Sequence, residues 1–267
     1  MRIMLTCIML IFFTLLNFTP SVTKNTGGNQ AGQQKPVFNV LVLTERGGQH
    51  EGFVSSALKW LEKISVENNF KVTVINHAKG LTGDYLARYK VFIQLDYPPY
   101  MWSDTSMTAF VKYIEKGKGG WIGFHHATLL GEFDGYSMWK WFSGFMGDIR
   151  FENYIAGKAE GKVIVEDSIH PVMKGVPVSF TVGEEEWYTY NKSPRPNVRV
   201  LAHVDESTYK PASGIKMGDH PVIWTNEKMK ARNVYILMGH DASLMRNDSY
   251  VRIFRNAIEW TSGHKLK

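Results

Sequence analysis

The chain has 267 residues, of which 31 are basic and 25 acidic, so its net charge is +6 at neutral pH. The charges are interspersed and form no long basic run, which argues against nucleic acid as a partner and leaves only a mild attraction to anionic sugars or acids. The single cysteine, Cys7, lies in an N-terminal segment that we expect to be removed, so disulfides and a cysteine nucleophile are both excluded.

The N-terminus has the layout of a secretory signal peptide, with one arginine followed by an almost uncharged apolar run up to residue 18. This run is shorter than the ~20 residues that span a bilayer, and a polar stretch follows it, so we expect no stable membrane insertion. We predict a signal peptide over residues 1–23 and a flexible linker over 24–36, rich in Gly, Asn and Gln. A single domain over 37–263 follows, in a periplasmic or secreted protein.

Strand-like and helix-like segments alternate in the first half of this domain. Apolar runs of strand length lie at 38–43, 70–75 and 91–95, and a fourth, at 121–124, follows two glycines. Between them, apolar residues at three- and four-residue spacings predict helices over 53–68 and 103–116, and 81–89 is a short connector. Because parallel strands need crossover connections, this alternation predicts an α/β fold with a doubly wound, mostly parallel sheet.

The stretch GGWIGFHHAT, residues 119–128, carries two adjacent histidines, His125 and His126, where a buried strand ends. The flanking glycines and small residues are typical of a strand that turns sharply into a helix. Ligands bind beyond the carboxyl ends of strands in α/β sheets, so the pair is a site candidate, and a core histidine beside a surface histidine is the alternative. The loop that begins at Asp96 should lie on the same side, and His50 lies in the polar loop after the first strand.

The segment 136–146 is dense in aromatic residues, among them Trp139, Trp141, Phe142 and Phe145. We favour core packing over the sheet edge as its role. A platform on which a sugar ring stacks is the alternative, because aromatic faces suit the apolar faces of sugar rings.

The second half of the domain contains short strand-like segments that are separated by turn residues rather than by helices. They lie at 161–165, 179–182, 198–202, 221–224 and 233–237. This half should therefore be strand-rich and partly antiparallel, and an amphipathic helix over 250–260 closes it.

Three polar features accompany these strands. The carboxylate cluster at 184–186 follows one of them, and neighbouring carboxylates raise one another's pKa, which suits a general acid or base; a solvated turn is the alternative. His240 follows the strand at 233–237 and is aimed at the same kind of edge as His125. His220 precedes a proline at a strand start and is also typical of a turn.

Together these motifs resemble the ThuA-like family, named for trehalose utilisation, whose fold is similar to that of the class I glutamine amidotransferases and is flavodoxin-like. The matching pieces follow the family's order over nearly the whole mature chain: VLVLTERGGQHEGF, GKGGWIGFHHAT, HPVMKGVP, EEEWYTY, HPVIW and RNVYILMGHD. The resemblance implies that residues 37–263 form one ThuA-like domain with a role in carbohydrate catabolism.

The chain departs from its relatives in two places. The elbow of the amidotransferases carries a cysteine nucleophile, but Phe124, His125 and His126 stand here, so glutamine hydrolysis by a thiol is excluded. The ThuA-like family often shows a Phe-x-x-His-Pro element after the aromatic segment, and residues 149–154, IRFENY, replace it here.

By resemblance, four residues fall where the family's motifs carry polar side chains, and we expect catalytic roles for them: His50, His125, Glu186 and His240. Further residues are expected to contact the substrate: His126, Trp187, Tyr188, Glu185, His220 and Asp96.

Two kinds of chemistry suit this set. A divalent metal such as zinc, bound by His125, His240 and Glu186, would activate water or polarise a sugar carbonyl. Without a metal, histidine and glutamate would act as an acid/base pair that moves a proton beside a keto-sugar carbonyl. No dinucleotide fingerprint of the G-x-G-x-x-G type follows a strand, so we do not expect NAD.

Two functions therefore stay open. The first is an exported hydrolase, isomerase or lyase that acts on a sugar or keto-sugar. The second is a non-catalytic carbohydrate-binding or partner protein on an amidotransferase-like scaffold, because fold alone does not fix function. The expected ligand is a small carbohydrate in both cases, and we leave open a homodimer.

Overall fold

The structure is a computed structural model that describes residues 35–45 and 48–267. The predicted signal peptide over 1–23 and the predicted linker, apart from its last two residues, lie outside the described residues. Residues Lys35–Lys267 form one compact unit.

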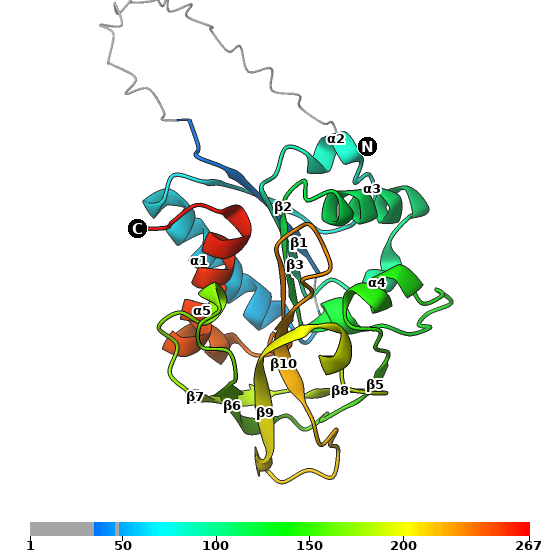
Figure 1. Ribbon diagram of the computed structural model, residues 1–267, viewed down its shortest axis with the longest axis vertical. Coiled ribbons are helices and arrows are strands. Elements are labelled where there is room, and N and C mark those ends of the chain that lie inside the picture. Colours follow the sequence, from blue (N-terminus) through cyan, green and yellow to red (C-terminus); the bar gives the residue numbers. More distant parts are fainter. Residues whose placement is uncertain (1–34, 46–47) are drawn as a thin grey trace, which may run out of the picture. The chain divides into compact units, whose positions relative to one another are not determined.

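A nine-stranded mixed sheet has the strand order β2-β1-β3-β4-β11-β10-β9-β6-β7 (Figure 1). Its first five strands are parallel: β2 (Lys71–Ile75), β1 (Asn39–Thr44), β3 (Val91–Leu95), β4 (Gly120–Phe124) and β11 (Asn233–Ile236). The next four pair in antiparallel fashion: β10 (Pro221–Thr225), β9 (Arg199–Lys210), β6 (Ala159–Val165) and β7 (Ser179–Glu185). Strand direction alternates from β11 through β10, β9 and β6 to β7. The strands β9 and β7 therefore run in the same direction as the five parallel strands.

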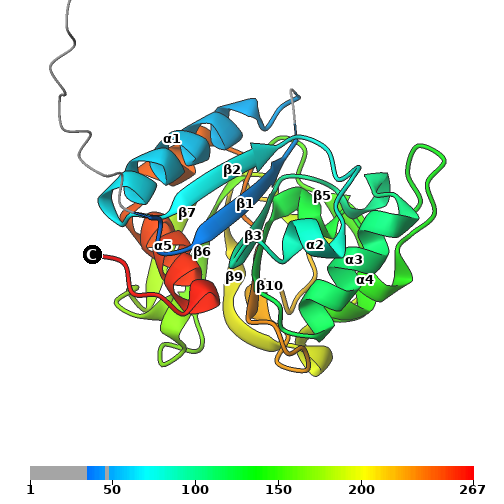
Figure 2. The ribbon, with the colours of Figure 1, turned by 90° about the horizontal axis from the view of Figure 1, so that it is seen from above.

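Helices cover both faces of the sheet (Figure 2). One face carries α1 (Glu51–Glu67) and α5 (Asp248–Ser262), and the other carries α2 (Gly83–Leu86), α3 (Asp104–Glu115) and α4 (Lys140–Phe145). Short 3-10 helices connect these elements at Pro99–Met101, His125–Thr128, Pro171–Met173, Arg195–Asn197 and Ala242–Arg246. Since both faces are covered, every residue of β3 and β4 is buried, as expected for central parallel strands.

The ends of the longer helices follow from their sequences. The side chain of Ser103 accepts a hydrogen bond from the N–H of Ser106 and so caps α3. Asn247 accepts hydrogen bonds from two N–H groups in the first turn of α5, and Gly263 ends that helix with a φ of 73°.

These observations confirm the α/β fold class, including the mixed second half. The main difference lies in the unpredicted strands β5 (Phe151–Tyr154) and β8 (Tyr188–Tyr190), which form a separate two-stranded antiparallel sheet. Both are short, and tertiary packing rather than an apolar run defines them. The strand expected at 198–202 continues as β9 to Lys210 because its polar second half pairs with β6 and alternates between buried and exposed residues.

The strand β4 ends differently from the prediction, because His125–Thr128 forms a 3-10 turn rather than an α-helix. The aromatic segment after this turn packs in the core, which confirms the favoured interpretation. Phe142 and Phe145 are fully buried against Phe110 and Trp121. The segment therefore supports the sheet rather than presenting a platform for a sugar.

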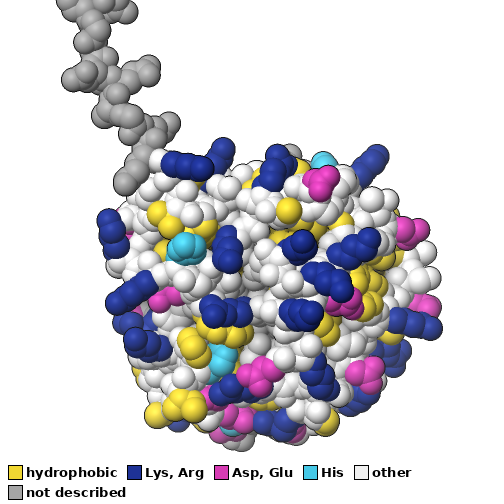
Figure 3. All heavy atoms as spheres, turned by 45° about the horizontal axis from the view of Figure 1, so that its top comes forward, with side chains coloured by type: hydrophobic (Ala, Val, Ile, Leu, Met, Phe, Trp, Pro, Cys, Tyr) yellow, Lys and Arg dark blue, Asp and Glu magenta, His cyan; other side chains and the backbone are white. Residues whose placement is uncertain are grey.

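Lys and Arg side chains are spread over the face in Figure 3, separated by other side chains rather than gathered in one patch. Within the described ranges, no helix has the combination of length and apolar character that crossing a bilayer requires.

Candidate functional site

Polar side chains gather at the carboxyl ends of the parallel strands. His125 directly follows β4, His240 lies beyond β11, and His50 is the N-cap residue of α1 after β1. His125 and Asp96, which follows β3, have positive φ angles of 39° and 54°. Such angles are uncommon for residues with a Cβ atom, so the surrounding structure must hold both turns in place.

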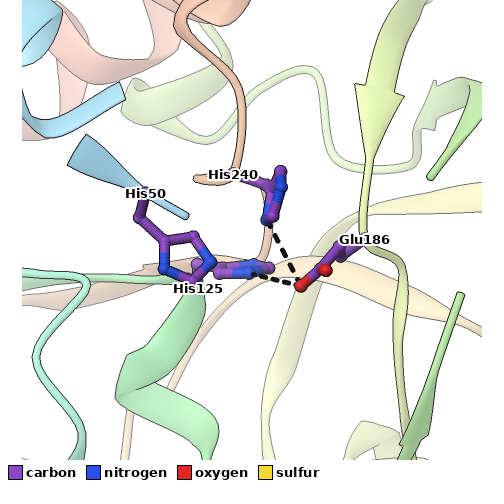
Figure 4. Close-up of side chains that lie close together, drawn as sticks. All are labelled: His50, His125, Glu186 and His240. Atoms are coloured by element: carbon purple, nitrogen blue, oxygen red, sulfur yellow. Dashed lines mark ion pairs between the residues drawn. The ribbon is translucent and has the colours of Figure 1, made fainter. Parts of the chain in front are cut away.

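Four buried side chains from distant parts of the chain converge at this edge, and we call them the histidine–glutamate group: His50, His125, Glu186 and His240 (Figure 4). Each offers one nitrogen or oxygen atom that lies within 4.8 Å of the others. Oε2 of Glu186 lies 3.2 Å from Nδ1 of His240 and 3.7 Å from Nε2 of His125.

The ring nitrogens of this group converge without hydrogen bonding to one another. Within the described part of the chain, Nε2 of His50, Nε2 of His125 and Nδ1 of His240 are buried and have no aligned hydrogen-bond partner. Buried polar atoms normally have partners, so this arrangement indicates a place for an ion, a water molecule or a substrate atom.

The tautomer of His125 is set by the backbone just beyond β11. Its Nδ1 lies 3.0 Å from the carbonyl oxygen of Leu237, which can only accept a hydrogen bond, so Nδ1 carries the proton. The lone pair of the neutral ring is therefore on Nε2, the atom that faces Glu186. In metal-binding and catalytic histidines, one ring nitrogen typically donates a hydrogen bond to a neighbouring group in this way, which fixes the tautomer and leaves the other nitrogen free to react or to bind.

The charges of the group follow from burial and from mutual contact. Burial lowers the pKa of His125 to about 3, so its ring is neutral at pH 7. Burial alone would raise the pKa of Glu186, but contacts with His125 and His240 lower it to about 2, so this carboxylate is ionised. Neutral imidazoles and an ionised carboxylate are the forms that bind a cation or accept a proton.

Two predicted residues, Glu185 and Asp96, lie behind the group rather than in contact with solvent. Glu185 is fully buried, its Oε2 accepts hydrogen bonds from the N–H groups of Gly239 and His240, and burial raises its pKa to about 8. Asp96 is also fully buried, and burial raises its pKa well above the usual range. Glu185 therefore holds the loop at residues 239–240, whereas neither carboxylate oxygen of Asp96 has a hydrogen-bond partner among the described residues. Substrate contact stays a prediction for both residues.

Glu45 belongs to the site although the sequence did not single it out. Its Oε2 lies 2.8 Å from Nδ1 of His126 and 3.6 Å from Nδ1 of His50. Burial alone would raise the pKa of Glu45, but these two histidines lower it to about 2. In the sequence, only its position directly after β1 indicated that Glu45 could join the site, because Asp96 and His125 follow neighbouring strands at the same edge.

A cavity of about 350 Å³ opens beside the group, which is within the size range of small-molecule sites. Its polar lining comes from Glu45, Gly48, Gln49, His50, His126 and Glu186, and its apolar lining from Leu129, Phe151, Tyr154 and Tyr188. The predicted contacts His126 and Tyr188 thus line the cavity. The ring of Tyr188 also packs on that of His125, with 4.2 Å between the centroids.

Two other predicted contacts, Trp187 and His220, are not among the lining residues. Trp187 is fully buried, and its Nε1 donates to the carbonyl oxygen of Ala159. His220 is buried between Glu206, at 2.8 Å from Nδ1, and the carbonyl oxygen of Tyr188, at 2.8 Å from Nε2. Both side chains are thus hydrogen-bonded within the protein and outside the cavity lining, and substrate contact stays a prediction for them.

Comparison with solved structures places the fold among known proteins. A ThuA-like protein from Bacteroides uniformis ATCC 8492 is 26% identical, with a TM-score of 0.75 over 90% of this chain and 98% of that one. A ThuA-like protein from Parabacteroides merdae ATCC 43184 is 20% identical, with a TM-score of 0.64 over 87% of this chain and 92% of that one. A protein from Thermoplasma acidophilum that is described as part of a GMP synthase is 12% identical with a TM-score of 0.53, over 85% of this chain and 94% of that one, and shares the fold.

Sequence comparison gives the family. No curated protein matches the chain. The family described as "ThuA: Trehalose utilisation" matches residues 39–261, which include every residue of the histidine–glutamate group. The chain therefore belongs to the ThuA family.

Proposed function

We propose that this protein is an enzyme that acts on a sugar or keto-sugar at the histidine–glutamate group. The observation that carries the proposal is the convergence beside a cavity of one ionised carboxylate and three buried imidazole nitrogens that have no aligned hydrogen bond within the described residues. Membership of a family of trehalose utilisation supports a carbohydrate as substrate. The only cysteine of the sequence is Cys7, so the described chain offers no thiol nucleophile.

The residues present fit a divalent cation such as zinc. Imidazole nitrogen and carboxylate oxygen are its usual ligands, and His50 joins the three ligands predicted from the sequence. Bound there, the ion would polarise a sugar carbonyl or activate water. The carbonyl of Leu237 and the carboxylate of Glu45 would keep the rings of His125 and His50 oriented.

Acid/base chemistry without a metal is a second candidate, favoured by the contact of 3.2 Å between Glu186 and His240. The ionised carboxylate of Glu186 would accept a proton from a carbon or hydroxyl beside a sugar carbonyl, and His240 would hold the carboxylate in place. His126, which lines the cavity, would bind a sugar hydroxyl.

Metal analysis combined with a panel of sugars tests both versions. We expect a stoichiometric divalent ion in the purified protein and turnover of at least one oxidised or unoxidised disaccharide. His125→Ala and His240→Ala should lose the ion and lower turnover by more than about 100-fold while the fold is retained. His77→Ala, a change at an exposed histidine outside the site, is the matched control and should keep both properties.

Each other outcome has a distinct meaning. Turnover by a metal-free protein would exclude the metal-assisted version and retain only the acid/base version. Sugar binding without turnover of any sugar would support the non-catalytic carbohydrate-binding alternative and overturn the proposed enzyme.

We also propose that the protein is exported, because the apolar N-terminal sequence has the pattern of a signal peptide. The mass of the mature protein from envelope or culture fractions should then correspond to a start near residues 21–24. A full-length chain that stays in the cytoplasm would contradict this.

A further inference from the structure

Three aromatic rings form one wall of the cavity, and we call them the aromatic corner: Phe151, Tyr154 and Tyr188. The rings of Phe151 and Tyr188 lie edge to face, with 5.0 Å between their centroids. The ring of Tyr154 lies 6.3 Å from each of the other two. The corner is built by β5 and β8, whose register pairs Tyr154 with Tyr188.

Core packing accounts for two of these rings but not for the third. Tyr188 is buried against His125, and Phe151 packs between Tyr188 and Phe133. Tyr154 remains 38% exposed at the cavity, one of the few large apolar side chains that the described chain leaves so open. An exposed aromatic ring beside a polar cavity is typical of a binding surface.

The aromatic corner and the histidine–glutamate group share this cavity. Glu186 and His50 line it together with the three rings of the corner, and the ring of Tyr188 also packs on His125 of the group. Gln49 adds an amide that can bind hydroxyl groups. A ligand that contacts the histidine–glutamate group in this cavity would therefore have the ring of Tyr154 within the same space.

We propose that the aromatic corner binds the second ring of a two-ring sugar, a disaccharide or other glycoside, whose first ring lies at the histidine–glutamate group. This inference rests on the proposed function. A pyranose ring has apolar C–H faces and polar edges, so it stacks on an aromatic face while its hydroxyl groups stay in water or bind amides. Tyr154 is thus the residue that selects a glycoside over a free monosaccharide.

Binding titrations of the full-length, as-purified protein with glucose, trehalose and maltose test this proposal. The parent should bind at least one disaccharide about tenfold more tightly than glucose, which corresponds to one aromatic contact. Tyr154→Ala should remove this preference and leave the affinity for glucose unchanged. Tyr154→Phe, which keeps the ring, should restore it.

Tyr136→Ala is the matched control, because Tyr136 is a 48% exposed tyrosine that does not line the cavity. Its affinities should equal those of the parent. Equal binding of glucose and the disaccharides by the parent, or a preference that survives Tyr154→Ala, would overturn the two-ring inference and leave the proposed function in place. Absence of both binding and turnover for every sugar would overturn the proposed function itself, and this inference with it.

Discussion

His125 illustrates how single residues of the site are held. Its backbone has a φ of 39°, its Nδ1 donates to the carbonyl of Leu237, and its ring packs on Tyr188. These restraints come from the turn after β4, from the backbone just beyond β11 and from β8, so three separate segments direct Nε2 toward Glu186. Such support is what a catalytic or metal-binding side chain needs to keep its geometry.

Glu45→Gln tests whether the carboxylate near His50 and His126 supports the group. The amide keeps the shape but removes the charge that orients both imidazoles, so zinc affinity should fall by about tenfold or more while the fold is retained. A competition titration with a chelator measures the affinity. Glu51→Gln, at an exposed glutamate in the first turn of α1, should leave it unchanged. Equal affinities for all three proteins would show that Glu45 has no such role.

At the scale of single residues, the sequence predicted which residues gather at the site, but it did not predict the direction of each side chain. The motifs named every member of the histidine–glutamate group, and their roles stay predictions. Trp187 and Glu185 are neighbours of Glu186, yet neither lines the cavity, because long-range hydrogen bonds hold Trp187 at Ala159 and Glu185 at Gly239 and His240. Glu45 was missed because only the fold brings it to His50 and His126.

At the scale of elements, the end of β11 must come very close to the turn after β4. Gly239 makes this approach possible: a Cβ atom there would lie 2.7 Å from Cβ of His125 and 2.8 Å from Oδ1 of Asp96. The Cβ of His125 is fixed to the backbone and cannot move aside alone. The spacing between these two segments therefore depends on the absence of a side chain.

Gly239→Ala should push the two segments apart, lower the free energy of unfolding by about 1–3 kcal/mol and weaken metal and sugar binding together. Urea unfolding and a metal titration of the same variant measure both effects. Gly183→Ala is the matched control, since a Cβ atom there would meet no atom within 4 Å, and it should change neither quantity appreciably. If Gly239→Ala changed neither binding nor the free energy of unfolding, the segments at Gly239 and His125 could move apart without a loss of stability, and the site would not depend on this glycine.

The elements that build the aromatic corner were the hardest to predict. β5 and β8 have three or four residues each, and they pair only with one another. Strands of this length carry too few residues for a hydrophobic period to stand out, so long-range pairing rather than local pattern defines them. The buried runs of β1, β3 and β4 were predictable because helices cover both of their faces.

At the scale of the whole molecule, the parallel half followed from the alternation of elements, whereas the order of the antiparallel strands did not. Sequence spacing does not reveal that β9 lies between β10 and β6. One charged network links the ends of these three strands. Arg195, just before β9, lies 2.7 Å from Glu166, which follows β6, and 2.6 Å from Asp219, which precedes β10.

Arg195→Gln tests what this network contributes to global stability. Arg195 lowers the pKa of Glu166 and of Asp219 below their ordinary values of 4.5 and 3.8. A carboxylate with a lowered folded-state pKa stabilises the fold above its ordinary pKa, and this stabilisation is lost as the pH falls through the folded-state pKa. The variant should therefore be less stable than the parent at pH 7, and the difference should shrink steadily below about pH 4.5.

The expected loss at pH 7 is about 1 kcal/mol or less, because the side chain of Arg195 is 40% exposed and solvent weakens such pairs. Urea unfolding in steps from pH 7 to pH 3 measures it, and about 1 M salt should reduce it by screening. Lys63→Gln removes only one exposed pair, at 4.0 Å from Glu67, and should have a smaller effect at every pH. A loss that stays constant from pH 7 to pH 3 would assign the role of Arg195 to packing of its aliphatic stem instead of its charge.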